Sequence, residues 1–322
     1  MKKLKFFFII VFITQSYLSF NSFAQGCCTA GSSTFGGLER GASNFGNLNL
    51  GLSFIRNGLN STFTGTNEID DPLNRAASVS SFNVDLEYGL AEKVSLLISS
   101  SYVVKSRETT IRSNETGNTE VIEFNGKGFG DVILLGKYEI ISPDVTSPLS
   151  LTFGGGVKLP FGSYTQEIDG SRLAIDLQPG TGSTDALLWG NFYKGFLPVP
   201  LAFSANALYR YAGSNLEGYR FGDEIIFSVN GEYSFTDYFT ISLSLRGRYA
   251  NEDFWGGRFL PSTGGSYYDL IPSLIYTEGL YSLKVFYQAP VYRNVQGIQL
   301  TTSNLLGVEL LFTLNINDLA NE

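Results

Sequence analysis

The sequence contains no histidine. Imidazole is the side chain that most often moves protons near neutral pH, so its absence excludes Ser-His-Asp hydrolases and histidine-ligated metal centres. Neighbouring carboxylates such as Asp85 and Glu87 could in principle do acid–base chemistry, but they equally fit a solvated polar face. We therefore expect no catalytic residue and predict that the protein is not an enzyme.

Charge is also scarce, and its sign is mainly negative. Charged residues make up 16% of the chain, and 30 acidic residues outnumber 22 basic ones for a net charge of −8. Phosphate backbones are bound by clustered lysine and arginine, so nucleic acid is excluded as a partner. The glycine-rich stretches 126–130 and 154–156 are not followed by Gly-Lys-Ser/Thr, and no nucleotide or other cofactor is expected.

Long apolar runs are missing except at the N-terminus. Three early lysines precede the apolar run 6–13, and Ser22-Phe23-Ala24 then places small residues two positions apart. This order is typical of a secretory signal peptide, and the run is shorter than the roughly 20 residues of a membrane-spanning helix. We predict a signal peptide over 1–24, cleaved after Ala24.

Cysteine occurs only twice, at Cys27 and Cys28, directly after the predicted cleavage site. Three interpretations stay open. Cys27 could carry a lipid, the pair could form a vicinal disulfide or bind a soft metal, or both thiols could be unmodified. Two sulfur ligands without histidine make an incomplete metal centre, so no metal site is predicted. The surrounding residues 25–43 are rich in Gly and Ser, which indicates a flexible N-terminal arm.

The sequence is rich, by contrast, in segments that alternate between apolar and polar residues. Clear examples are 82–88, 225–235 and 239–249. In the last of these, Ile241, Leu243 and Leu245 fall on one face, while Arg246 and Arg248 fall on the other. A period of two is the signature of a strand with two different faces, and charged residues at every second position do not fit a buried helix. Such strands are typical of membrane barrels, which are apolar outside and polar inside.

Twelve segments of this kind are predicted as strands: 44–56, 79–89, 93–106, 129–141, 149–160, 184–194, 200–211, 222–235, 238–250, 267–277, 281–290 and 302–315. The connections between them alternate between long, as at 57–78, 107–128 and 291–301, and short, as at 236–237. Long extracellular loops and short periplasmic turns are the pattern of outer-membrane barrels. The predicted fold is all-β: a transmembrane, antiparallel, up-and-down β-barrel of about 12 strands over 44–315, followed by a polar tail, 316–322.

Ionisable residues of both signs fall on the predicted inner face. The candidates to line the lumen are Asp85, Glu87, Asp131, Lys137, Lys158, Asp185, Arg210, Glu232, Arg246, Arg248, Lys284 and Glu309, with Glu139, Glu224 and Asp269 on the same face. Two interpretations compete. Either these side chains line a water-filled pore and set its selectivity, or they pair across a narrow lumen and hold the wall together. Arg246 and Arg248 are the favoured candidates for contacts to anions, since they project one above the other.

The middle of the chain resembles a known family. Gly128-Phe129-Gly130-Asp131 with Lys137-Tyr138, then Lys158-Leu159-Pro160, then Gln178-Pro179-Gly180 form a succession similar to the outer-membrane transporters named after the MetA pathway of phenol degradation. Those proteins are distantly akin to the long-chain fatty-acid channels. The resemblance implies a barrel that admits hydrophobic or aromatic small molecules. It does not extend to the N-terminal plug of the fatty-acid channels, because few residues precede the first predicted strand.

We therefore expect a barrel in the outer membrane of a Gram-negative bacterium that serves as a channel for passive uptake of small solutes, hydrophobic or aromatic ones among them. The alternative is a non-transporting surface barrel that binds a partner through its long extracellular loops. Expected partners are outer-membrane lipid and lipopolysaccharide, the solute itself, and the barrel-assembly machinery during biogenesis.

Overall fold

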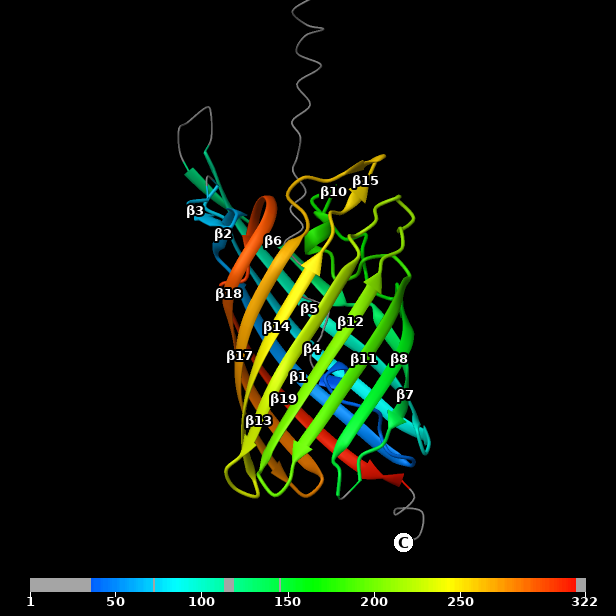
Figure 1. Cartoon of the computed structure of the whole chain (residues 1–322). Helices are drawn as coiled ribbons and strands as arrows, with labels where there is room; N and C mark the ends of the chain where they lie inside the picture. The colour runs from blue at the N-terminus through cyan, green and yellow to red at the C-terminus, as the bar shows by residue number, and fades with distance from the viewer. Residues whose placement is uncertain (1–35, 72, 113–118, 145, 317–322) are drawn as a thin grey trace, which may run out of the picture.

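Strands of alternating polarity close on themselves into a barrel. The computed structural model describes residues 36–71, 73–112, 119–144 and 146–316. Within these residues, twelve antiparallel strands form a closed ring in which each strand pairs with its neighbour in sequence, and β1 pairs with β19 to complete it (Figure 1). The ring consists of β1 (Asn47–Leu59), β4 (Ala76–Ala91), β5 (Val94–Arg112), β7 (Val132–Ile141), β8 (Leu149–Leu159), β11 (Asp185–Phe196), β12 (Leu201–Tyr211), β13 (Glu224–Ser234), β14 (Phe239–Ala250), β17 (Gly265–Glu278), β18 (Tyr281–Thr301) and β19 (Asn304–Asn315). The predicted fold class is confirmed.

The alternation of the sequence becomes the two faces of the wall. On β4, Phe82, Val84 and Leu86 are exposed on the outside, while Asn83 and Asp85 are buried inside. Exposed Ile241, Leu243 and Leu245 on β14, and similar residues on the other strands, continue this outer surface around the barrel. An outward apolar band over a polar interior is the arrangement that lipid requires. The molecule is an outer-membrane β-barrel.

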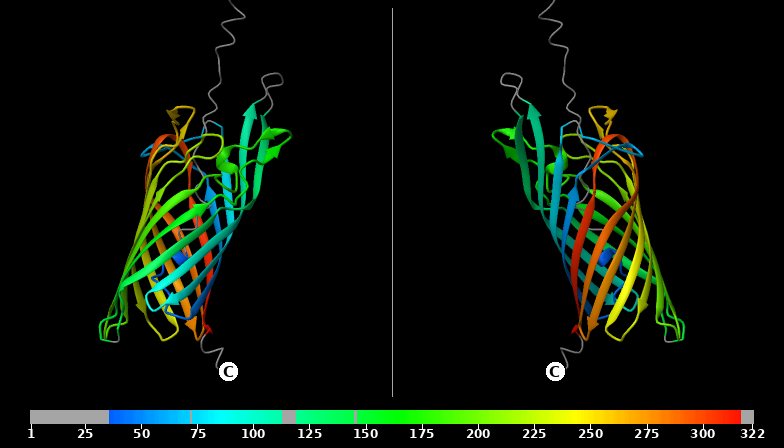
Figure 2. Two further views of the ribbon diagram at one scale, coloured as in Figure 1. Left: turned by 90° about the vertical axis from the view of Figure 1, so that its right-hand side faces the viewer. Right: turned by 90° about the vertical axis from the view of Figure 1, so that its left-hand side faces the viewer.

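The connections at the two ends differ as the sequence predicts. Short turns gather at the end where β19 finishes, and the longer connections gather at the opposite end (Figures 1 and 2). Several of the longer connections contain small elements, namely β2 (Ser61–Gly65), β3 (Asn67–Ile69), β6 (Thr119–Phe129), β9 (Glu167–Ile168), β10 (Ser171–Arg172), β15 (Phe254–Trp255), β16 (Arg258–Phe259) and the 3-10 turn η2 (Ile175–Leu177). In the described part of the chain, no helix is long and apolar enough to cross a bilayer.

Two predicted loops are wrong. Residues 107–128 are mostly strand, because β5 continues to Arg112 and pairs with β6 in a hairpin that rises above the rim (Figure 1). Residues 291–301 are also strand, because β18 runs on to Thr301 and pairs with β2. Polar residues and Pro290 interrupt the alternation there, and the register shifts near Asp269 and again between Val295 and Ile298. Such bulges break the period of two from which the strands were predicted.

Candidate functional site

A segment of the chain lies inside the barrel. Residues 36–43, here called the inner segment, include the 3-10 turn η1 (Gly36–Leu38), whose three residues are all buried. Figure 2 shows η1 enclosed by the strands about midway along the barrel. This part of the predicted flexible arm is therefore packed against the wall. Gly36 has φ +77°, and a Cβ there would lie 2.2 Å from Asp85 Oδ2, so glycine is required for this fit.

Lys137 on β7 holds the backbone of the inner segment. Its Nζ donates hydrogen bonds to the carbonyl oxygens of Gly37 at 2.7 Å and Arg40 at 2.9 Å. The same ammonium group forms an ion pair with Glu87 on β4 at 2.9 Å and lies 4.8 Å from the centre of the Trp189 ring. Its side chain has no exposed surface. A buried ammonium is stable only when it is paired and hydrogen-bonded, and this network provides both.

Carboxylates of β4 bind the amides of the inner segment. Asp85 accepts a hydrogen bond from Gly37 N at 2.8 Å, and Glu87 accepts one from Ser43 N at 3.0 Å. Glu87 also accepts a hydrogen bond from the Ser95 hydroxyl at 2.7 Å. These contacts join the inner segment to β4 and β5 at both of its ends.

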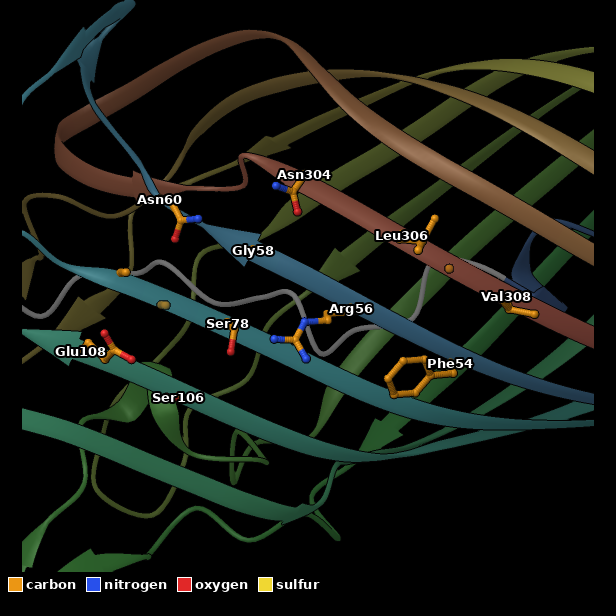
Figure 3. Close-up of a pocket in the computed structure, with 13 residues that line it drawn as sticks. Phe54, Arg56, Gly58, Asn60, Ser78, Ser106, Glu108, Asn304, Leu306 and Val308 are labelled. Carbon is orange, nitrogen blue, oxygen red and sulfur yellow. The ribbon is translucent and has the colours of Figure 1, made fainter.

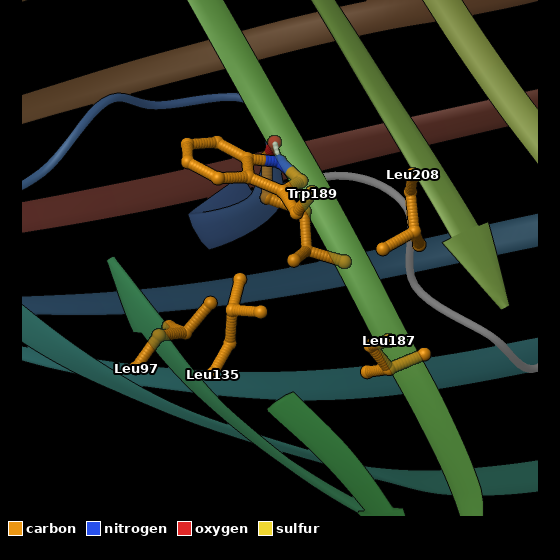
Figure 4. Packing of buried hydrophobic residues seen from close by; sticks show 6 residues of the cluster. Leu97, Leu135, Leu187, Trp189 and Leu208 are labelled. Atoms are coloured by element: carbon orange, nitrogen blue, oxygen red, sulfur yellow. Dashed lines mark hydrogen bonds between the residues drawn. The ribbon is translucent and has the colours of Figure 1, made fainter. Parts of the chain in front are cut away.

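The apolar side of the inner segment packs on a small cluster within the barrel. Leu38 packs with Leu97, Leu135, Leu187, Trp189 and Leu208, which come from four different strands (Figure 4). The indole Nε1 of Trp189 donates a hydrogen bond of 2.8 Å to the carbonyl of Leu38. Sequence reasoning missed Trp189, because inward apolar residues break the expected polar pattern of a barrel interior.

Ion pairs attach the inner segment to two further strands of the wall. Arg40 pairs with Glu309 on β19 at 2.6 Å, and Glu39 pairs with Lys284 on β18 at 2.7 Å. Together with the contacts to β4 and β7, these pairs fix the inner segment to four strands of the barrel. Five of the predicted inner residues therefore contact the inner segment: Asp85, Glu87, Lys137, Lys284 and Glu309. The sequence did not predict this segment.

A second group of predicted residues forms a belt of alternating charge near the long-loop end. Lys158 lies 2.7 Å from Asp131 and 3.1 Å from Asp185. Arg210 pairs with Asp185 at 3.2 Å and with Glu224 at 2.9 Å, and Glu224 also pairs with Arg248 at 2.8 Å. Three cations and three anions therefore neutralise one another. This belt favours the interpretation in which inner charges pair along the wall.

The two arginines predicted to contact anions are already engaged. Arg248 pairs with Glu224, as described, and its guanidinium lies 5.1 Å from the centre of the Tyr267 ring. Arg246 donates to Gln288 at 3.4 Å and faces Asp269 by strand register. An arginine whose charge is balanced by a buried carboxylate attracts a passing anion less strongly than an unpaired one. Contacts of Arg246 and Arg248 to anions stay a prediction.

The connection 161–183 folds inward at the same end. Asp176 in η2 pairs with Arg107 at 2.7 Å, and Lys105 Nζ donates to the carbonyl oxygens of Asp176 and Gln178 at 3.0 and 2.9 Å. Burial raises the pKa of Asp176 above its ordinary value, and the nearby Arg107 and Lys105 oppose that rise. A cavity beside this connection, lined by Arg210, Arg248 and other residues, has a volume of only about 20 Å³.

A larger polar cavity lies beside the inner segment. Its volume is about 170 Å³, and it is bounded by Glu39, Arg40, Ser204, Asn206, Ser228, Asn230, Glu232, Ser244, Ile275, Ser282, Lys284, Glu309 and Leu311. Serine hydroxyls and asparagine amides from β12, β13 and β14 dominate this wall. Glu232, another predicted residue, accepts a hydrogen bond from Asn230 at 2.7 Å and lines the cavity. The space can hold several water molecules or a small polar molecule.

Among the described residues, no group of three or more His, Cys, Asp and Glu side chains is arranged to hold a metal ion. Cys27 and Cys28 lie outside the described residues, as does the predicted signal peptide. The alternatives for the cysteine pair therefore stay as predictions.

The barrel is similar to known outer-membrane barrels in structure. The sequence matches no family model, and no curated protein is significantly similar to it. The COG4313 outer membrane channel from Pseudomonas putida F1 superposes with a TM-score of 0.63 at 11% identity, over 87% of this chain and 99% of that one. A FadL homologue from Pseudomonas aeruginosa gives 0.42 at 10% identity, over 90% and 98% of the two chains, and the NanC porin gives 0.42 at 12%, over 82% and 100%. At 11% identity, the similarity to the COG4313 channel shows the fold alone.

Proposed function

We propose that the protein is a passive channel for small polar solutes and that the inner segment keeps it closed in this conformation. The observation that carries the proposal is the polar cavity of about 170 Å³ enclosed by the barrel wall beside the inner segment. A barrel whose only task is to hold its own wall together has no need of a hydrated space. Solute would move down its gradient, without a cofactor and without chemical change.

The lining of the cavity supports a polar solute. Serine and asparagine side chains can exchange hydrogen bonds with a hydroxylated or charged molecule as it passes, at little cost in desolvation. Leu97 and Leu135 are packed under Leu38 and do not line this space, to which only Ile275 and Leu311 contribute apolar side chains. The hydrophobic or aromatic solutes implied by the resemblance to MetA-pathway transporters are less well matched, and that relationship stays a prediction.

A second candidate function is a barrel that does not transport. The anchoring of the inner segment favours it, because hydrogen bonds and ion pairs from β4, β7, β11, β18 and β19 converge on residues 37–43. In that case the long connections would do the work by binding a partner at the cell surface. Solute flux separates the two functions, since only a channel increases the swelling rate of liposomes in an isosmotic solution of a small polyol.

Glu232 offers a test of the polar path. We expect Glu232→Lys to shift the ion selectivity of the open channel toward anions, because the substitution replaces the negative charge in the cavity with a positive one. The measurement is the reversal potential across a planar bilayer under a salt gradient. Glu252→Lys, on the connection after β14, makes the same change of charge outside the cavity and serves as the control. Equal reversal potentials for the two variants would contradict the proposed path.

A further inference from the structure

The outer wall carries a groove that the channel does not use. It has a volume of about 590 Å³ and lies across β19, β1, β4 and β5 near their long-loop ends (Figure 3). Its lining includes Phe54, Arg56, Asn60, Ser78 and Asn304. Small outward residues, Gly58 and Ala76 among them, form the depression. The volume is within the range of sites that bind small molecules.

An aromatic row lies beside the groove on the outer wall. Phe54 faces Phe82 in strand register, Phe82 faces Tyr102, and Tyr102 faces Phe129 on β6. All four rings are outward and exposed. A row of aromatic side chains on the outside of a barrel marks the boundary between hydrocarbon and headgroups.

Just beyond this row, charged side chains join the apolar ones on the outer face, and apolar side chains face inward. One pairing position further along the strands, outward Arg56 on β1 is paired in register with β4. Outward Lys127 on β6 is paired in register with β5. On the inside at this end, Leu59, Val79 and Val103 form a buried apolar cluster. The strands therefore extend past the hydrocarbon layer here, and the groove opens toward the headgroups of the outer leaflet.

Arg56 is available to a ligand. Among the described residues, no carboxylate forms an ion pair with it, although most inward arginines of the barrel are paired. The amides of Asn60 and Asn304 and the hydroxyl of Ser78 line the same groove, and the carboxylate of Glu108 lines it at an end away from Arg56 (Figure 3). A guanidinium accompanied by neutral hydrogen-bond donors is the chemistry that recognises phosphate. Below them, Phe54, Leu306 and Val308 offer an apolar surface for an acyl chain.

We propose that this groove binds a phosphorylated glycolipid of the outer leaflet, with its phosphate on Arg56 and an acyl chain along Leu306 and Val308. We favour a lipid over a free anion as the ligand, because the hydrogen-bond donors of the groove lie next to its apolar surface. The proposal does not depend on whether the barrel conducts.

Native mass spectrometry of the full-length protein in detergent tests the site. The probes are diphosphoryl lipid A and the same lipid after removal of its phosphates. We expect the unmodified chain to retain the phosphorylated lipid about tenfold more strongly, the effect of one charge-assisted contact. Arg56→Gln should abolish this preference. Arg258→Gln, which removes an exposed arginine outside the groove, should leave it unchanged.

A second variant tests the shape of the groove rather than the charge of Arg56. Ser78→Phe fills the groove while keeping Arg56, and it should reduce retention of the phosphorylated lipid to a similar extent. The proposal is overturned if Arg56→Gln binds lipid like the unmodified chain. It is also overturned if inorganic phosphate displaces the lipid at equal concentration, because the site would then be one for the free anion.

Discussion

Deletion of residues 36–43 is expected to raise the conductance of the barrel severalfold in planar bilayers. The inner segment is held by Lys137 on β7 and Asp85 on β4, and by Lys284 on β18 and Glu309 on β19. Its removal joins the polar cavity of about 170 Å³ to the space that η1 occupies. The wall should survive the change, because the strand pairing of the barrel does not involve these residues.

Leu38→Ala provides the control for this deletion. The substitution removes apolar contacts to the Leu97 cluster but leaves the backbone carbonyls that bind Lys137 and Trp189. The variant should keep the conductance of the unmodified chain. Equal conductance for the deletion and the unmodified chain would mean that the inner segment does not block the path.

Lys137→Met is expected to lower the free energy of unfolding by about 3–5 kcal/mol, the usual cost of removing one partner from a buried ion pair. Methionine approximates the length of lysine but leaves the Glu87 carboxylate buried and without its cation. The carbonyls of Gly37 and Arg40 lose their donor as well. Urea unfolding of the folded barrel in lipid vesicles measures the difference.

Two further variants isolate the cause of that loss. Adding Glu87→Gln to Lys137→Met should recover part of the stability, because the uncompensated charge is then removed. Lys93→Met, at an exposed turn, should change the unfolding free energy by less than about 0.5 kcal/mol. If Lys137→Met lowered the free energy of unfolding no more than Lys93→Met does, the network around Lys137 would not stabilise the folded barrel.

The strands could be predicted because the lipid imposes a simple rule on their sequence. Each ring strand places apolar side chains outward, so residues such as Phe82, Val84 and Leu86 display the period of two directly. The same rule identified which ionisable residues point inward, since Asp85 and Glu87 fall between them. The rule failed at β18 beyond Pro290. There the strand contains bulges and pairs with β2, and it extends past the bilayer, where lipid no longer dictates the sequence.

The inner segment could not be predicted in the same way. Most of its contacts use backbone amides and carbonyls, which are present in every sequence and leave no pattern. Gly36 and Gly37 are needed for close packing on Asp85 and Leu97, but glycine in an N-terminal arm is equally typical of a flexible linker. Only the charges of Glu39 and Arg40 offered a signal, and their partners Lys284 and Glu309 lie far along the chain.

A disulfide between the inner segment and the wall tests the central claim most directly. A Cβ at Gly41 would lie 3.5 Å from Thr152 Oγ1, so Gly41→Cys with Thr152→Cys is close to the geometry of a disulfide. Cys27 and Cys28 would be replaced by serine in this chain to prevent exchange. The account predicts that the oxidised protein is closed in planar bilayers and that reduction restores the conductance of the unmodified chain, whose inner segment is held only by non-covalent contacts. Conductance of the same size before and after reduction would contradict it.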